Sequence, residues 1–169
     1  MNALVGLVGC GYWGSNLARS FSRLGVLGAI ADASPAVTQA KAAENGVRGL
    51  SIEALINDPQ LQAVAVATPA ETHAAVALAA LAAGKHVFVE KPIALNEQDA
   101  AAVSIAAEKA GKTVMVGHLL QYHPAFEALL GLVRSGELGS LRYVYSHRLS
   151  LGKLRTEENA LWSFAPHDL

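Results

Sequence analysis

Short apolar runs alternate with alanine-rich stretches through the first two thirds of the chain, and this alternation constrains the fold more than any other feature. The strand-like runs cover residues 3–8, 26–32, 47–50, 61–68, 86–90 and 113–117. The stretches of helical period between them cover residues 14–24, 35–45, 52–57, 70–83 and 97–110. Strands and helices that alternate at this spacing predict an α/β fold with a parallel, doubly wound sheet of the Rossmann type.

Capping residues set the ends of several predicted helices. Ser34 can cap the helix that starts at Pro35, and Gly46 follows its end. Asn96 can cap the helix of residues 97–110, which Gly111 then ends. Ser51 can begin a short helix that Asp58 and Pro59 stop. These local signals strengthen the assignment of alternating elements.

The pattern changes after His118. Residues 124–134 have the apolar spacing of an amphipathic helix, and residues 141–150 alternate as a half-buried strand would. One helix and one strand cannot bury an independent core. We therefore predict a Rossmann domain over residues 1–118, and the beginning of a second α+β domain, not completed, over residues 119–169.

Composition excludes several classes of protein. Thirteen basic and fourteen acidic residues give a net charge of −1, and no Lys/Arg cluster indicates a nucleic-acid partner. No apolar run approaches the roughly 20 residues that a membrane span needs. The N-terminus lacks the basic region of a signal peptide, and the single Cys10 is typical of a reducing compartment. We expect a cytoplasmic protein with neither a nucleic-acid nor a membrane partner.

The first strand-like run ends in a glycine loop of the form GxGxxG. Gly9 would allow a tight turn, Gly11 would let a pyrophosphate approach the backbone, and Gly14 would let helix and strand pack closely. Asp32 ends the second strand, where such folds place the acid that binds a ribose diol. Its charge would repel the 2′-phosphate of NADP, so we predict NAD as the cofactor. The alternative is a turn-forming glycine cluster with an ordinary strand-end aspartate.

Aromatic and polar residues surround this predicted site. Tyr12 and Trp13, inside the loop, could cover the cofactor or pack on the sheet, and Cys10 is interpreted as a small filler. Two later strands end in Thr68-Pro69 and in Glu90-Lys91-Pro92, at the edge where open α/β sheets bind ligands. Lys91, fixed beside a proline, suits proton transfer, although a surface lysine before a turn is the simpler alternative.

Residues 67–95, ATPAETHAAVALAALAAGKHVFVEKPIAL, resemble the glucose–fructose oxidoreductase and inositol dehydrogenase family, Gfo/Idh/MocA. The glycine loop, a TP…H segment and an EKP motif occur in the order that is typical of the family. The resemblance implies that Thr68, Pro69 and His73 line the cofactor site. It also implies that Glu90 and Lys91 lie by the nicotinamide ribose, with Lys91 reaching the substrate hydroxyl.

Residues 117–169 are similar to the branch of the family that oxidises UDP-N-acetylhexosamines, or their uronic acids, at the sugar 3-hydroxyl. His167 matches the catalytic histidine of the family, but Ser163 stands where many members carry an aspartate. Lys91 and His167 are therefore the predicted catalytic pair. Three basic residues could hold a diphosphate or a uronate, or could form a solvated loop: Arg148, Lys153 and Arg155.

Together these features predict an NAD-dependent dehydrogenase that oxidises a secondary hydroxyl of a sugar or sugar nucleotide. We expect a homo-oligomer in the full-length protein and no metal site, because His118 and His123 have the wrong spacing for shared ligation. Two alternatives remain: a non-catalytic NAD-binding or scaffold module, and an unrelated Rossmann protein such as a methyltransferase. The EKP motif argues against the second.

Overall fold

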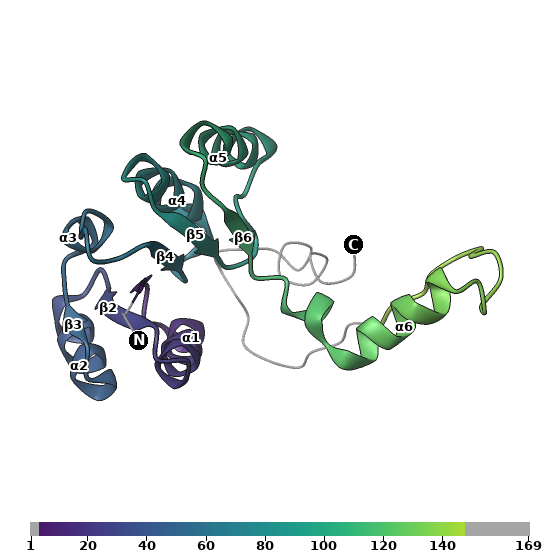
Figure 1. Cartoon of the computed structure of the whole chain (residues 1–169), viewed down its shortest axis with the longest axis horizontal. Coiled ribbons are helices and arrows are strands. Elements are labelled where there is room, and N and C mark those ends of the chain that lie inside the picture. The colour runs from purple at the N-terminus through teal and green to yellow at the C-terminus, as the bar shows by residue number, and fades with distance from the viewer. Residues whose placement is uncertain (1–3, 148–169) are drawn as a thin grey trace. The chain divides into compact units, whose positions relative to one another are not determined.

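The computed structural model describes residues 4–147, and its sheet is parallel throughout (Figure 1). Six strands form it in the order β3-β2-β1-β4-β5-β6. Their bounds are β1 Val5–Val8, β2 Leu27–Ala31, β3 Arg48–Gly49, β4 Ala63–Val66, β5 His86–Val89 and β6 Val114–Val116. The predicted Rossmann-type parallel sheet is confirmed, and each strand lies within its predicted run.

Helices cover both faces of this sheet. They are α1 Tyr12–Arg23, α2 Pro35–Asn45, α3 Ile52–Ile56, α4 His73–Ala82 and α5 Glu97–Ala110, with a 3₁₀ turn, η1, at Ala70–Thr72 before α4. One buried cluster joins α1 and α2 to the sheet, and a second joins α3, α4 and α5 to it. The two clusters divide the helices between the two faces, which is the doubly wound arrangement.

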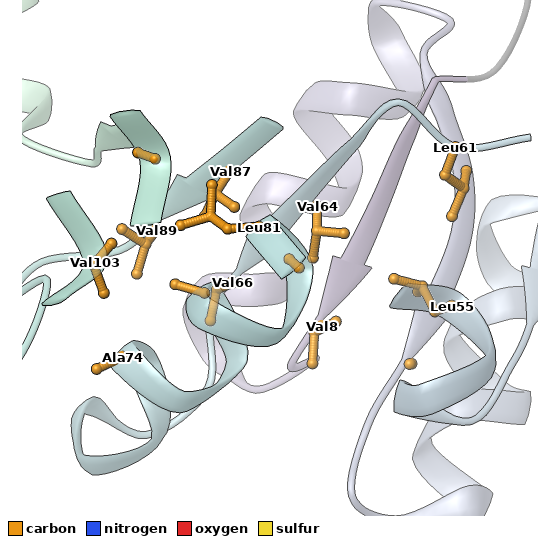
Figure 2. Close-up of a cluster of buried hydrophobic side chains, with 14 of the residues drawn as sticks. Val8, Leu55, Leu61, Val64, Val66, Ala74, Leu81, Val87, Val89 and Val103 are labelled. Atoms are coloured by element: carbon orange, nitrogen blue, oxygen red, sulfur yellow. The ribbon is translucent and has the colours of Figure 1, made fainter. Parts of the chain in front are cut away.

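The second cluster contains most of the large buried side chains. Figure 2 shows Val64 of β4 between Leu55 of α3 and Leu81 of α4, with Val66 of β4 near Leu81, all buried. Neighbouring residues of β4 point to opposite faces, and Ala65 belongs to the first cluster. Both faces of β4 are therefore covered, which explains why its sequence is continuously apolar.

The predicted caps are present. Ser34 accepts a hydrogen bond from the N–H of Val37 at 3.5 Å, and Asn96 accepts one from Asp99 at 2.8 Å. Gly46 and Gly111 end their helices at φ values of 65° and 62°, the left-handed conformation that favours glycine. A good N-terminal cap stabilises a helix by about 1 kcal/mol. These local signals fix where α2 and α5 begin and end.

Contacts within the chain separate two compact units, Met1–Gly117 and His118–Leu169. The described part of the second unit contains a 3₁₀ turn, η2 Leu119–Tyr122, and α6 Pro124–Arg134, as the spacing of apolar residues predicts for α6. His123 caps α6, its Nδ1 accepting from the N–H of Ala125 at 3.2 Å. The assignment of residues 119–169 to a second α+β domain stays a prediction.

The predicted strand over residues 141–150 is wrong for residues 141–147, which form no strand. A strand is stabilised by hydrogen bonds to a neighbouring strand, and every strand in residues 4–147 belongs to the one sheet of the first unit. The alternation of apolar and polar residues in 141–147 is therefore not sufficient for a strand, because no strand of the described residues pairs with this segment.

None of the helices within residues 4–147 has the length and apolar character needed to cross a membrane.

Candidate functional site

The candidate site lies at the carboxyl ends of three adjacent strands. β4 pairs in parallel with β1 on one side and with β5 on the other, so the loops that follow these strands meet at one edge. The strand order reverses between β1 and β4. Open α/β sheets bind ligands at this switch point, outside the carboxyl ends of the strands.

The three glycines of the loop after β1 have different roles. A β-carbon on Gly9, whose φ is +92°, would lie 2.6 Å from the carbonyl of Ala67, and one on Gly14 would lie 2.0 Å from the oxygen of Gly9. A β-carbon on Gly11 would meet nothing within 4 Å. Gly9 and Gly14 are therefore required by packing, whereas Gly11 borders open space that a ligand can enter.

The start of α1 provides electrostatic attraction for an anion at this open space. Gly11 is the N-cap residue, no side chain caps the helix, and its first turn contains no acidic residue. The first N–H groups of a helix have no partner within the helix, and the helix dipole adds partial positive charge there. The arrangement fits the pyrophosphate of a dinucleotide.

Asp32 is held against the glycine loop. One carboxylate oxygen, Oδ2, accepts the backbone N–H of Cys10 at 2.8 Å, and the other, Oδ1, accepts the N–H of Ser34 at 3.0 Å. Each oxygen has further lone pairs, so hydroxyl groups can still donate to it. The half-buried carboxylate is thus fixed at the end of β2, where it fits a ribose diol.

Cys10 is buried within the loop and is not poised for reaction. Its Sγ lies 3.8 Å from the carbonyl oxygen of Ala31. Burial, with a smaller contribution from the Asp32 charge, raises the pKa of the Cys10 thiol to about 11. The reactive species of cysteine is the thiolate, so this residue acts as a small filler, as the sequence indicates.

Trp13 and Glu90 connect the glycine loop to the segment after β5. The indole N–H of Trp13 donates to Oε1 of Glu90 at 2.5 Å. Glu90 is only 9% exposed, and burial raises its pKa, while the hydrogen bond from Trp13 partly opposes that rise. A β-carbon on Gly117 would lie 2.9 Å from the same oxygen. The sequence left the role of Trp13 open and gave no role to Gly117.

His73 joins the segments that follow β4 and β5. Its Nδ1 lies 2.7 Å from the carbonyl oxygen of Pro92, and its Nε2 lies 2.8 Å from that of Thr68. Both partners are carbonyl oxygens, so a ring nitrogen that carries a hydrogen can donate to the oxygen beside it. With 2% of its surface exposed, His73 supports the site from inside. Its predicted contact with a cofactor stays a prediction.

The remaining predicted residues have different surroundings. Thr68 is half-buried, with its Oγ1 2.7 Å from that of Thr72, and Pro69 is exposed. Lys91 is half-buried beside Glu90, and its peptide bond to Pro92 is cis. Tyr12 is 87% exposed at the start of α1. Four predicted site residues lie outside the described residues: Arg148, Lys153, Arg155 and His167.

The edge thus brings together the glycine loop, the Asp32 carboxylate and the segment of Glu90 and Lys91. Residues 3–118 match the Gfo/Idh/MocA oxidoreductase family, which is described as having an NAD-binding Rossmann fold. The chain belongs to this family. The resemblance predicted from residues 67–95 is confirmed, and the first unit is an NAD(P)-binding Rossmann domain.

Individual relatives support the same assignment. UDP-N-acetylglucosamine 3-dehydrogenase of Acidithiobacillus ferrooxidans is 31% identical over 97% of this chain and 51% of its own length. Inositol 2-dehydrogenase of Rhizobium meliloti is 33% identical over 85% of this chain and 44% of its own. The crystal structure of an NAD-binding oxidoreductase from Klebsiella pneumoniae matches with a TM-score of 0.76 and 33% identity, over 82% of this chain and 40% of that one.

The chain spans about half the length of these relatives. Within residues 4–147, no three residues of the types that bind metals lie close enough together to hold an ion. Residues 3–118 are the part of the chain that matches the NAD-binding Rossmann domain of the family.

Proposed function

We propose that the protein is an NAD-dependent dehydrogenase that oxidises a secondary hydroxyl of a sugar, the 3-hydroxyl of a UDP-N-acetylhexosamine or of its uronic acid. The observation that carries this proposal is the meeting of the glycine loop with Glu90 and Lys91 at one sheet edge. The choice of substrate is supported by the match to UDP-N-acetylglucosamine 3-dehydrogenase over 97% of this chain.

The preference for NAD over NADP rests on Asp32. Its two oxygens accept hydrogen bonds from Cys10 and Ser34, so the carboxylate cannot turn away from the ribose position without losing both. A 2′-phosphate placed there would face a fixed negative charge at short range. In the partly screened surroundings of a protein surface, that repulsion costs on the order of 1–4 kcal/mol.

The reaction divides between the cofactor and the side chains of the protein. When bound, NAD supplies the nicotinamide that accepts a hydride from the carbon bearing the hydroxyl. Lys91 polarises the hydroxyl oxygen or relays its proton, and His167 is our first choice for the base that receives it. Arg148, Lys153 and Arg155 bind the diphosphate or the uronate by charge-assisted hydrogen bonds.

The direct test is oxidation of candidate substrates by the purified protein with NAD, followed by NADH absorbance. UDP-N-acetylglucosamine and its uronic acid are the expected substrates, and inositol is the comparison. Reduction of NAD by inositol alone would overturn the sugar-nucleotide assignment. Binding of NADH without turnover of any of the three compounds would favour the alternative, a non-catalytic NAD-binding module. This alternative is considered because the chain matches only about half of the length of each relative.

A further inference from the structure

The hydrogen bond between Trp13 and Glu90 crosses the carboxyl end of a third strand. Trp13 belongs to the first turn of α1, directly after β1, and Glu90 follows β5. β1 and β5 do not pair with each other, because β4 lies between them. The bond therefore joins residues 77 positions apart in sequence across the middle of the site edge.

The Glu90 side of this bond is held firmly. Glu90 is 9% exposed, and its carboxylate lies against Gly117, where an added β-carbon would approach Oε1 to 2.9 Å. Glu90 is also the direct neighbour of Lys91, so a fixed Glu90 restricts the backbone that carries Lys91. Trp13 lies in the first turn of α1, the turn whose free N–H groups we propose to bind the pyrophosphate.

We propose that Trp13 is a positioning residue whose indole N–H, through the Glu90 carboxylate, holds the phosphate-binding end and the Lys91 end of the site in one arrangement before the cofactor binds. The proposal rests on the proposed placement of the nicotinamide beside Lys91. A ligand that spans both ends gains affinity from such preorganisation, because less ordering remains to be done on binding. A ligand that occupies the phosphate end alone gains little.

This difference separates positioning from general support of the fold. NADH spans the whole site, whereas ADP carries only the adenosine and the pyrophosphate. Trp13→Phe keeps an aromatic ring and removes the N–H donor. Calorimetric titration should show NADH binding about tenfold more weakly to this variant, the equivalent of about 1.4 kcal/mol, which one hydrogen bond to a charged group can supply. ADP binding should change by less than about twofold.

A second variant tests whether the two side chains act as a pair. In Trp13→Phe the buried Glu90 carboxylate has lost its indole donor, and Glu90→Gln removes that charge while its amide oxygen can still accept from Trp13. The loss of NADH affinity caused by Trp13→Phe should therefore fall to about threefold in the Glu90→Gln background, because groups in contact are not additive. Glu108→Gln, the same change at an exposed position of α5, is the matched control.

The outcomes are distinct. Equal losses for NADH and ADP in a folded Trp13→Phe protein would assign Trp13 a structural role only, and unchanged NADH affinity would exclude positioning. Additive effects of the two substitutions would show that the residues do not act through each other. If the unaltered protein bound neither NADH nor ADP, the dinucleotide site itself would be overturned, and this proposal with it.

Discussion

Asp32 and Cys10 are joined by a hydrogen bond of 2.8 Å between the carboxylate of one and the backbone N–H of the other. The bond ties the end of β2 to the glycine loop after β1, so the Asp32 carboxylate and that loop are held together. Ser34 holds the second carboxylate oxygen at 3.0 Å. The direction of the carboxylate is therefore set by the backbone, and its charge is available to select between cofactors.

Asp32→Asn should reduce the selectivity for NADH over NADPH. The amide oxygen can still accept the N–H of Cys10, whereas the negative charge that repels a 2′-phosphate is gone. We expect the ratio of the two affinities to fall by about tenfold, which corresponds to about 1.4 kcal/mol. Thermal-shift titrations with both cofactors measure it, with Glu108→Gln as the control for loss of a carboxylate elsewhere. An unchanged ratio would show that Asp32 does not set cofactor choice.

Gly11→Ala and Gly14→Ala should separate binding from folding. The added methyl at Gly11 enters open space, so stability should fall by less than about 1 kcal/mol while NADH binding is lost. At Gly14 the methyl would lie 2.0 Å from the oxygen of Gly9, so overpacking should cost about 1–3 kcal/mol or more. Urea unfolding and NADH titration of both variants check this. Retained NADH affinity in Gly11→Ala would contradict the assigned phosphate position.

Lys91→Ala should impair catalysis and spare cofactor binding. Loss of a group that transfers a proton or polarises an oxygen lowers turnover by about 10²–10⁴-fold. NADH affinity should remain within about threefold, a change of less than 1 kcal/mol. The measurement is steady-state turnover together with NADH titration, and Lys109→Ala on the exposed surface of α5 is the control. Normal turnover in Lys91→Ala would remove Lys91 from the mechanism.

His73→Phe should destabilise the first unit. It removes a ring whose two nitrogens lie 2.7 and 2.8 Å from the carbonyl oxygens of Pro92 and Thr68, at a position only 2% exposed. Loss of a buried hydrogen bond that leaves its acceptor without a donor lowers the free energy of unfolding by about 1–3 kcal/mol. His86→Ala, which removes one exposed bond of 3.1 Å, should cost less than about 1 kcal/mol. Similar losses in the two variants would contradict a buried bridge at His73.

Glu90→Gln should change how stability depends on pH. Burial raises the pKa of Glu90 above its ordinary value of 4.5, so the folded state binds this proton more tightly than the unfolded state. The resulting stabilisation is complete below that value and is lost as the pH rises through the folded pKa. Relative to Glu90→Gln, the unaltered protein should therefore lose stability as the pH rises from 4.5 through the raised pKa of folded Glu90. Urea unfolding at a series of pH values upward from 4.5 tests it, and a gain in stability of the unaltered protein relative to Glu90→Gln over that series would contradict the prediction.

The features that the sequence predicted correctly depend on residues close together in the chain. Ser34 and Asn96 cap helices through bonds to residues three positions later, and the glycine loop acts within six residues. The strand-like runs were recognisable because a strand with both faces covered is apolar throughout. Local chemistry was sufficient for these elements.

Long-range contacts account for what the sequence left open. The bond from Trp13 to Glu90 and the bridge made by His73 depend on which loops the sheet order places side by side. For residues 141–147 the alternation of apolar and polar side chains predicted a strand, but these residues form none. A strand also needs a neighbouring strand to pair with, and the alternation gives no information about that neighbour. A pattern along the chain specifies the faces of an element but not its neighbours.

The close packing of Gly117 against Glu90 has an evolutionary consequence. A side chain at position 117 would collide with the carboxylate, and Gly117 is also the last residue of the first unit. Related sequences that keep an acid at position 90 should keep glycine at position 117. Those that acquire a larger residue at 117 should carry a shorter one at 90, so the two positions are expected to covary.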